Sequence, residues 1–473
     1  MIFLFTFALV LAAFADPDVC QDVTMDMPLT KVYYYPANWN DTGKSPPHIA
    51  ASQKCTFKFT IPNGMYADLL ITNDDTNSVM ITDSRGVARP GTSIYTDRYF
   101  FIAPGFSVTV QTNTKPVLFG IQVNWRPYPN FAPKQFSIHP NTVPTILVGN
   151  DTQTGAVITA ESQVSLLTTV AFANDVNSFL RLTQIFDGSD TNAPFLGNLL
   201  DLLASNNQLV STGKTLTLFS LIPAFIGNQM IVQDYFNVKQ FKTYTTINCL
   251  DQVTCNAALD ATNGPAAAVR VYPHYLNYLS MGSNSTVTVY QGSIMDAHAI
   301  IIYDKNSAAV STPQKFTSSL TTYAMDNGQA SFVVSQYDTK KWGVATDKRQ
   351  GFFVSPNFGE LSVNQGLNEL IQGEGNDVYN ITYQVKVSGL MDGATLRLQV
   401  FNGNNAVLDQ VYTKDQLPGN DVKTIVGQNF NVIYDNKGSA TNGLQMSFKY
   451  DKTSSTNCIS VMLIFVISLV LRL

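Results

Sequence analysis

Side chains that could carry acid–base chemistry are few and scattered in this sequence. Its four histidines lie far apart, and none falls in a helix-spaced metal motif such as His-Glu-X-X-His: His48, His139, His274 and His298. Asp296 comes two residues before His298, but residues two apart in an extended segment share a face without forming a catalytic triad. We therefore expect the histidines to be exposed or held by structural hydrogen bonds.

Two pairs of carboxylates, Asp74 with Asp75 and Asp187 with Asp190, have the residue types of a glycosidase acid and base. Both pairs lie in turn-like stretches, where aspartate is favoured because it bonds to nearby main-chain groups. The sequence also lacks a Gly-X-Ser-X-Gly nucleophile elbow and a phosphate-binding glycine loop. We therefore predict that the protein is not an enzyme; a secreted hydrolase is a distant alternative.

A weak calcium hypothesis rests on four oxygen-bearing side chains that lie close in sequence: Asn73, Asp74, Asp75 and Asp83. The alternative is a solvated loop with no bound ion. Near the cysteines, no Cys-X-X-Cys motif or pair of histidines supports a zinc site. We therefore assign no metal site and no cofactor.

The odd number of cysteines is awkward for a secreted protein. They are Cys20, Cys55, Cys249, Cys255 and Cys458, and cleavage of the C-terminal tail would remove the last. The remaining four allow three pairings. We favour Cys20 with Cys55 and Cys249 with Cys255, because the members of each pair are close in sequence. Closing the first loop, of roughly 35 residues, would stabilise the fold by about 3.5 to 4 kcal/mol.

The N-terminal segment indicates secretion. Residues 1–15, MIFLFTFALVLAAFA, end in Ala13-Phe14-Ala15, the small-residue pattern of a signal peptidase site, so the mature chain is expected to start near Asp16. A retained N-terminal membrane helix is the less favoured alternative, since the apolar run is short. Four Asn-X-Ser/Thr sequons predict N-glycosylation on exposed faces of separate units: Asn40, Asn150, Asn284 and Asn380.

The C-terminal residues 452–473 read as an attachment signal and a hydrophobic tail. The apolar run from Ile459 to Leu471 would rise only roughly 20 Å as a helix. The hydrocarbon core of a bilayer is about 30 Å thick. A small polar run precedes it, which fits exchange for a glycosylphosphatidylinositol (GPI) anchor at Ser454, Ser455 or Asn457. The alternatives are a retained tail anchor, or neither.

The clearest strand pattern lies in the stretch CTFKFTIPNGMYADLLI, from Cys55 to Ile71. Apolar residues alternate with polar ones up to Ile61, Pro62-Asn63-Gly64 supplies turn residues, and the alternation then resumes. We predict a β-hairpin pinned by Cys55. Similar short runs follow, with no long amphipathic helix, and they favour an all-β sandwich or barrel.

Composition limits the classes of partner. Hydrophobic residues make up 45% of the chain, charged residues 13%, and the formal net charge is −5. A weakly acidic chain with no basic run argues against nucleic acid as a partner. The length of 473 residues is enough for three or four domains after both end segments are set aside.

Five separated blocks within residues 20–129 resemble the nematode CUB-like domain. They are Val32-Tyr33-Tyr34-Tyr35-Pro36 with Trp39, Cys55-Thr56-Phe57 with Ile61-Pro62-Asn63-Gly64-Met65-Tyr66, Thr82-Asp83-Ser84-Arg85-Gly86, Tyr99-Phe100-Phe101 and Val123-Asn124-Trp125-Arg126-Pro127. The resemblance implies a secreted jelly-roll β-sandwich, often in GPI-anchored or gut-lumenal proteins linked to defence against pathogens. Some CUB domains bind calcium, but the residues of that motif are not matched here.

Weaker repeats extend the resemblance along the chain. The block Leu180–Gly188 looks like part of an ordinary CUB domain, and it recurs at Leu396–Gly403, with one residue fewer, and loosely at Val287–Gly292. The shorter copy needs a bulge or an adjusted turn if its packing is to match. Gly351–Phe358 looks like an opening strand, and two closing strands are expected to pair, at Asn429–Tyr434 and Gly443–Tyr450.

We therefore predict tandem CUB-like jelly-roll β-sandwiches in an all-β chain. The predicted divisions are a signal peptide at 1–15, a CUB-like domain at 16–130, further sandwich units at 131–255, 256–347 and 348–451, and the C-terminal signal at 452–473. The unit at 256–347 has the weakest sequence support.

The aromatic residues Tyr33, Tyr34, Tyr35 and Trp39 allow two interpretations. They could fill the core beneath the predicted hairpin, or they could form a platform that stacks on carbohydrate. Adjacent tyrosines in a strand point to opposite faces, so at least one should be exposed in either case.

These inferences together favour a non-enzymatic, GPI-anchored glycoprotein at the cell surface. From the resemblance, we expect recognition or adhesion in an innate immune response at an epithelial surface. The main alternative is a structural glycocalyx component without a specific ligand, and the alternative location is secretion without an anchor. The expected partners are an unknown protein or glycan ligand and, through the anchor, the membrane.

Overall fold

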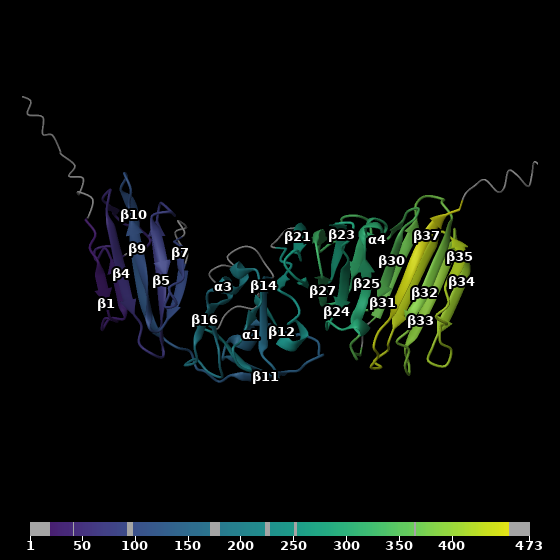
Figure 1. Cartoon of the computed structure of the whole chain (residues 1–473), viewed down its shortest axis with the longest axis horizontal. Coiled ribbons are helices and arrows are strands. Elements are labelled where there is room, and N and C mark those ends of the chain that lie inside the picture. The colour runs from purple at the N-terminus through teal and green to yellow at the C-terminus, as the bar shows by residue number, and fades with distance from the viewer. Residues whose placement is uncertain are drawn as a thin grey trace, which may run out of the picture.

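Four β-sandwiches follow one another along the chain and lie in a row (Figure 1). The computed structural model describes residues 19–40, 42–91, 98–170, 180–222, 228–249, 253–363 and 366–453. Both end segments, predicted as a signal peptide and an attachment signal, lie outside these residues, apart from Lys452 and Thr453. Each sandwich encloses its own apolar core. The prediction of an all-β chain is confirmed.

The first sandwich spans β1 to β10, and its core is rich in aromatic rings. One sheet has the order β1 (Val23–Met25), β4 (Lys54–Thr60), β9 (Gly105–Gln111), β6 (Val79–Thr82) and β7 (Ala88–Pro90). The other has the order β2 (Val32–Tyr35), β10 (Val117–Pro127), β5 (Met65–Asn73) and β8 (Arg98–Ile102), with β3 (His48–Ile49) also paired to β10.

The second sandwich spans β11 to β19. One sheet has the order β11 (Lys134–Ile138), β13 (Ala156–Ala160), β18 (Thr215–Ser220), β15 (Thr183–Phe186) and β16 (Phe195–Asn198). The other has the order β12 (Thr145–Val148), β19 (Asn228–Asp234), β14 (Val164–Val170) and β17 (Leu209–Val210). Short helices join these strands: α1 (Gly149–Thr152), α3 (Leu199–Ser205) and the 3₁₀ turn η1 (Tyr235–Asn237).

The third sandwich spans β20 to β28. One sheet has the order β20 (Thr243–Thr246), β22 (Ala266–Val271), β27 (Leu320–Met325), β24 (Val287–Gln291) and β25 (Ala299–Tyr303). The other has the order β21 (Thr254–Asp260), β28 (Gln329–Ser335), β23 (His274–Met281) and β26 (Gln314–Phe316). The connections include η2 (Asp296–His298) and α4 (Lys305–Ser311).

The fourth sandwich spans β29 to β37. One sheet has the order β29 (Val344–Ala345), β31 (Gly366–Gly373), β36 (Asn429–Asp435), β33 (Thr395–Asn402) and β34 (Asn405–Tyr412). The other has the order β30 (Gln350–Val354), β37 (Gln445–Lys452), β32 (Tyr379–Val387) and β35 (Lys423–Gly427).

The same strand plan recurs in all four sandwiches. The N-terminal strand of each unit pairs in parallel with a later strand: β1 with β4, β11 with β13, β20 with β22, and β29 with β31. Every other pairing between the strands is antiparallel, as in a jelly roll. The chain therefore consists of four copies of one fold.

The repeated sequence blocks correspond to equivalent strands. Three strands occupy the same place in their sheets. β15 lies between β18 and β16, β24 lies between β27 and β25, and β33 lies between β36 and β34. Each also carries a β-bulge at a matching place, at Ile185/Phe186, Val289/Tyr290 and Val400/Phe401. The bulge expected in the shorter copy is thus present, and the other two copies have it as well.

The predicted hairpin at Cys55–Ile71 is wrong. β4 pairs with β1 and β9, whereas β5 pairs with β8 and β10 in the opposite sheet. The turn at Pro62-Asn63-Gly64 therefore crosses the sandwich from one sheet to the other. Alternation identifies the face of a strand that meets the core, but it does not identify the neighbouring strand. The predicted pair of closing strands is wrong for the same reason, since β36 and β37 lie in opposite sheets.

The sheets divide the chain differently from the predicted domain limits. The predicted limit between residues 255 and 256 falls inside β21, and β20 already belongs to the third sandwich. The limit between 347 and 348 follows β29, which belongs to the fourth. In both cases the prediction missed the short N-terminal strand of the unit. That strand pairs with the strand two places later in the chain, β20 with β22 and β29 with β31.

Buried side chains join each sandwich to the next. Between the first and second, an apolar cluster includes Tyr66, Phe100, Phe186 and Phe219. A second cluster, which includes Leu167 of the second sandwich and Ala324 of the third, joins these two units. At the next junction, the core of the third sandwich includes side chains from residues 352–358 of the fourth. Apolar junctions of this kind restrict relative domain motion.

Candidate functional site

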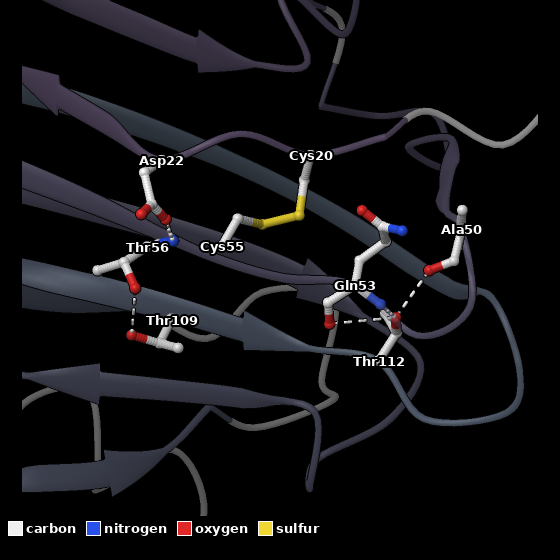
Figure 2. The surroundings of a disulfide bond; sticks show 8 residues. All are labelled: Cys20, Asp22, Ala50, Gln53, Cys55, Thr56, Thr109 and Thr112. Atoms are coloured by element: carbon white, nitrogen blue, oxygen red, sulfur yellow. Dashed lines mark hydrogen bonds between the residues drawn. A yellow bond between two sulfur atoms is a disulfide. The ribbon is translucent and has the colours of Figure 1, made fainter.

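The two favoured disulfides are present. Cys20 and Cys55 are bonded, with both side chains buried, and the bond fastens the segment before β1 to β4 (Figure 2). Beside it, the main-chain N–H of Thr56 donates to the Asp22 carboxylate at 2.7 Å. Cys249 and Cys255 form the second bond, which links the segment before β21 to the start of that strand.

The four sequons fall one in each sandwich. Asn40, Asn150 and Asn284 are exposed. Asn380 lies in β32, where it alternates with buried residues and so occupies the solvent side of the sheet. Glycosylation stays a prediction at all four positions. The attachment candidates Ser454, Ser455 and Asn457 lie outside the described residues, as does Cys458.

The structure does not bring the calcium candidates together. Asp83 lies just beyond the C-terminal end of β6 and pairs with Arg85 at 2.7 Å, whereas Asn73, Asp74 and Asp75 lie at the other end of that strand. Asp75 accepts hydrogen bonds from Asn77 and Ser78, and these bonds lower the pKa of its carboxyl group. Across the described ranges, no three His, Cys, Asp or Glu side chains gather as metal ligands.

The aromatic group is mainly part of the core. Tyr33 contacts the Phe59 ring, and Tyr35 contacts the Phe57 ring at a centroid distance of 4.5 Å. Tyr34 points to the other face, where its hydroxyl meets the amide of Gln122. Trp39 is buried and donates to the main chain of the loop that follows it. The core interpretation therefore fits these contacts.

The histidines and acidic pairs form no common site. His48 is exposed, and His139 is an exposed partner of Glu161. His274 and His298 are buried, and burial lowers the pKa of each. The carboxylate of Asp187 accepts hydrogen bonds from Thr212, and that of Asp190 accepts one within its own turn. Asp74 accepts from the main chain of Leu118.

A pocket of about 310 Å³ lies at the junction of the third and fourth sandwiches. One wall comes from the end of α4 and the following Thr312-Pro313, and the other from the loop around β29. Four cations and two carboxylates line it: Lys340, Lys341, Lys348, Arg349, Asp347 and Glu374. A charged pocket of this size could hold a small polar ligand.

Arg349 is the most unusual residue of this junction pocket. Only 5% of it is exposed, and its guanidinium donates to the main-chain carbonyls of Pro313 at 3.0 Å and Trp342 at 3.1 Å. Its Nε has no hydrogen-bond partner among the described residues. Burial lowers the pKa of Arg349 to about 10, against smaller opposing effects of neighbouring groups that include Asp338, so the side chain stays cationic at neutral pH.

The sequence predictions missed these pocket residues. The cations lie in the loops between two sandwiches, which no strand pattern singles out. A signal was present, however, because two basic doublets, Lys340-Lys341 and Lys348-Arg349, occur eight residues apart in a chain with 29 Lys and Arg residues in all. Such spacing in a sequence poor in charge marks a local concentration of positive charge.

Two solved structures each match less than half of this chain. The CUB1-EGF-CUB2 domains of rat MASP-1 match with 11% identity over 45% of this chain and 99% of that chain, with a TM-score of 0.17. The equivalent domain of human MASP-1/3 matches with 9% identity over 42% of this chain and 100% of that chain, with a TM-score of 0.18. No curated protein matches the sequence. No helix in the described part of the chain is long and apolar enough to cross a membrane.

Three family models match successive parts of the chain. The model of the CUB-like domain matches residues 16–129. Models described as Domain of unknown function (DUF7592) and Domain of unknown function (DUF7591) match residues 138–221 and 236–337. These ranges fall on the first, second and third sandwiches. The first sandwich is therefore similar to the CUB-like family, as its sequence blocks predict.

Proposed function

We propose that this chain is a non-enzymatic surface glycoprotein that acts by recognition or adhesion outside the cell. The junction pocket carries the proposal. Positively and negatively charged side chains line it, its volume of about 310 Å³ suits a small polar ligand, and its walls come from two sandwiches. The disulfides and the CUB-like first domain support an extracellular location. From the sequence resemblance, we propose a more specific role: the chain acts as a nematode-type CUB-like protein in an innate immune response at an epithelial surface.

The proposed anchor is a GPI group at Ser454, Ser455 or Asn457. These residues directly follow Thr453, whose main-chain N–H donates to the carbonyl of Val378 and so secures the end of β37. Treatment of cells that display the protein with phosphatidylinositol-specific phospholipase tests the anchor. Release into the medium is expected; retention, with lipase-resistant anchors excluded, would favour a tail anchor instead.

A panel of glycans and microbial surfaces tests the recognition role. The full chain should bind some members of the panel selectively. No binding to any member would favour a structural glycocalyx component without a specific ligand. A hydrolytic activity that is lost on changing a single Asp or His would contradict both interpretations and favour a secreted hydrolase.

A further inference from the structure

We propose that the junction pocket binds an acidic saccharide, with its sulfate or carboxylate group held by Lys340, Lys341 and Arg349. The proposal rests on the recognition role above and names the ligand class for it. Three features of the pocket carry the proposal: two lysines and a buried arginine that form no ion pair with a described carboxylate, and two acids that line the same cavity.

Two lysines of the pocket have no acidic partner in the described part of the chain. Lys340 and Lys341 are exposed, and neither ammonium group lies within 4.0 Å of a carboxylate oxygen there. Lys348 differs, because it pairs with Asp451 at 3.3 Å. The positive charges of Lys340 and Lys341 are therefore available to an anionic ligand.

Arg349 adds a cation that is costly to bury. Its hydrogen bonds go to main-chain carbonyls, and no carboxylate of the described ranges lies within 4.0 Å of its guanidinium. A buried charge without a carboxylate at ion-pair distance is unfavourable, and an anion in the adjoining cavity would offset that cost. The guanidinium carbon of Arg349 also lies over the Trp342 ring, 4.9 Å from its centroid.

The acids of the pocket favour a saccharide over a bare inorganic anion. Asp347 and Glu374 line the same cavity, and carboxylates accept hydrogen bonds from hydroxyl groups. A cavity of about 310 Å³ also exceeds the space needed by a small inorganic ion. A sugar that carries one acidic group and several hydroxyls matches both charges of the lining.

The pocket lies beside the C-terminal end of the last strand. The main-chain N–H of Lys452, at the end of β37, donates to Asp347 at 2.8 Å. The segment that leads to the apolar tail therefore starts next to the pocket. Attachment through that tail would hold the pocket close to the cell surface, where acidic glycans are displayed.

The backbone of the pocket offers a variant that removes charge without strain. Lys341 has φ of +57°, in the left-handed region that glycine adopts at little cost. Lys341→Gly therefore deletes one positive charge and keeps the turn. Lys437 provides the matched control: it is an exposed lysine with φ of +44°, beyond β36 at the other end of the fourth sandwich.

Calorimetric titration of the full chain, purified in detergent, tests the proposal. The probes are sulfated lactose, sialylated lactose, neutral lactose and inorganic sulfate. We expect saturable binding of at least one acidic lactose, weakened by added salt, and no comparable binding of lactose or sulfate. Lys341→Gly should weaken it severalfold, Lys340→Gln with Lys341→Gly about tenfold or more, and Lys437→Gly less than twofold. Equal melting temperatures would verify that the variants are folded.

Four results would overturn the proposal. Equal binding of lactose would remove the role of the acidic group, and equal binding of inorganic sulfate would remove the role of the sugar. Unchanged affinity of the doubly substituted variant would place any binding elsewhere. If neither acidic lactose binds but the chain still binds members of the panel of glycans and microbial surfaces, the ligand class is refuted and the recognition role stands. If the chain binds neither the acidic lactoses nor any member of the panel, the ligand class and the recognition role are both refuted.

Discussion

His274 is a buried histidine of the third sandwich whose protonation affects the stability of the fold. It begins β23, is 1% exposed, and its ring stacks on Phe316. Its Nδ1 lies 3.1 Å from the carbonyl oxygen of Tyr272, which can only accept, so Nδ1 carries the proton. Its Nε2, 2.7 Å from the hydroxyl of Tyr323, then accepts a hydrogen bond from that group. This arrangement requires a neutral imidazole.

Burial, helped by the charge of Arg270, lowers the pKa of His274 from 6.5 to about 3 in the folded protein. Below pH 6.5 the unfolded chain therefore takes up a proton that the folded chain does not take up until about pH 3. The stabilising contribution is full above 6.5 and is lost as the pH falls between these values. From pH 7 to pH 5 the loss is about 1.9 kcal/mol.

Native-state hydrogen exchange of the amides in β23 and β27, corrected for intrinsic rates, measures this loss locally. The matched variant is His274→Gln, which keeps a donor and an acceptor but does not titrate. Other titrating groups contribute equally to both proteins, so the difference in opening free energy between them isolates His274. That difference should shrink by about 1.9 kcal/mol between pH 7 and pH 5. A difference that stays constant with pH would refute the reasoning, because it would mean that the imidazole charges as easily in the fold as outside it.

Three further predictions concern the stability of single units and one junction. Replacing both Cys20 and Cys55 by serine should destabilise the first sandwich by about 4 kcal/mol, since the bond closes a separation of 35 residues, and exchange in β9 unchanged from wild type would contradict this. Gly105→Ala should cost about 3 kcal/mol or more, because the new Cβ would lie 2.0 Å from the carbonyl oxygen of Phe59; a normal melting temperature would disprove the clash. Gln314→Ala removes two hydrogen bonds to the main chain of β30, at 3.0 and 3.2 Å. It should speed proteolysis between the third and fourth sandwiches, and equal cleavage rates would argue against a role for that amide in the junction.

The sequence predicted the type of fold better than its connections. Alternation and turn residues identified strands such as β4 and β5, and the block repeats identified the equivalent strands β15, β24 and β33. The same alternation arises whether two consecutive strands pair or face each other across a core. For that reason Cys55–Ile71 was predicted as a hairpin, although it crosses between sheets.

The walls of the candidate site could not be predicted from sequence patterns for a different reason. The charge of Arg349 matters because the third sandwich supplies the carbonyl of Pro313 and closes one wall of the pocket. No local pattern places α4 opposite the loop around β29. The disulfides were predictable by contrast, because each bond joins two cysteines that are consecutive along the chain.

Four copies of one sandwich are held as a single body, and the junction pocket depends on this because its walls come from two of them. Small-angle X-ray scattering of the full chain, in matched-out detergent, tests this claim most directly. One arrangement of the four sandwiches, in the row of Figure 1, should reproduce the scattering curve without an ensemble. A curve that requires the third and fourth sandwiches to move independently would contradict the claim and, with it, the existence of a preformed pocket.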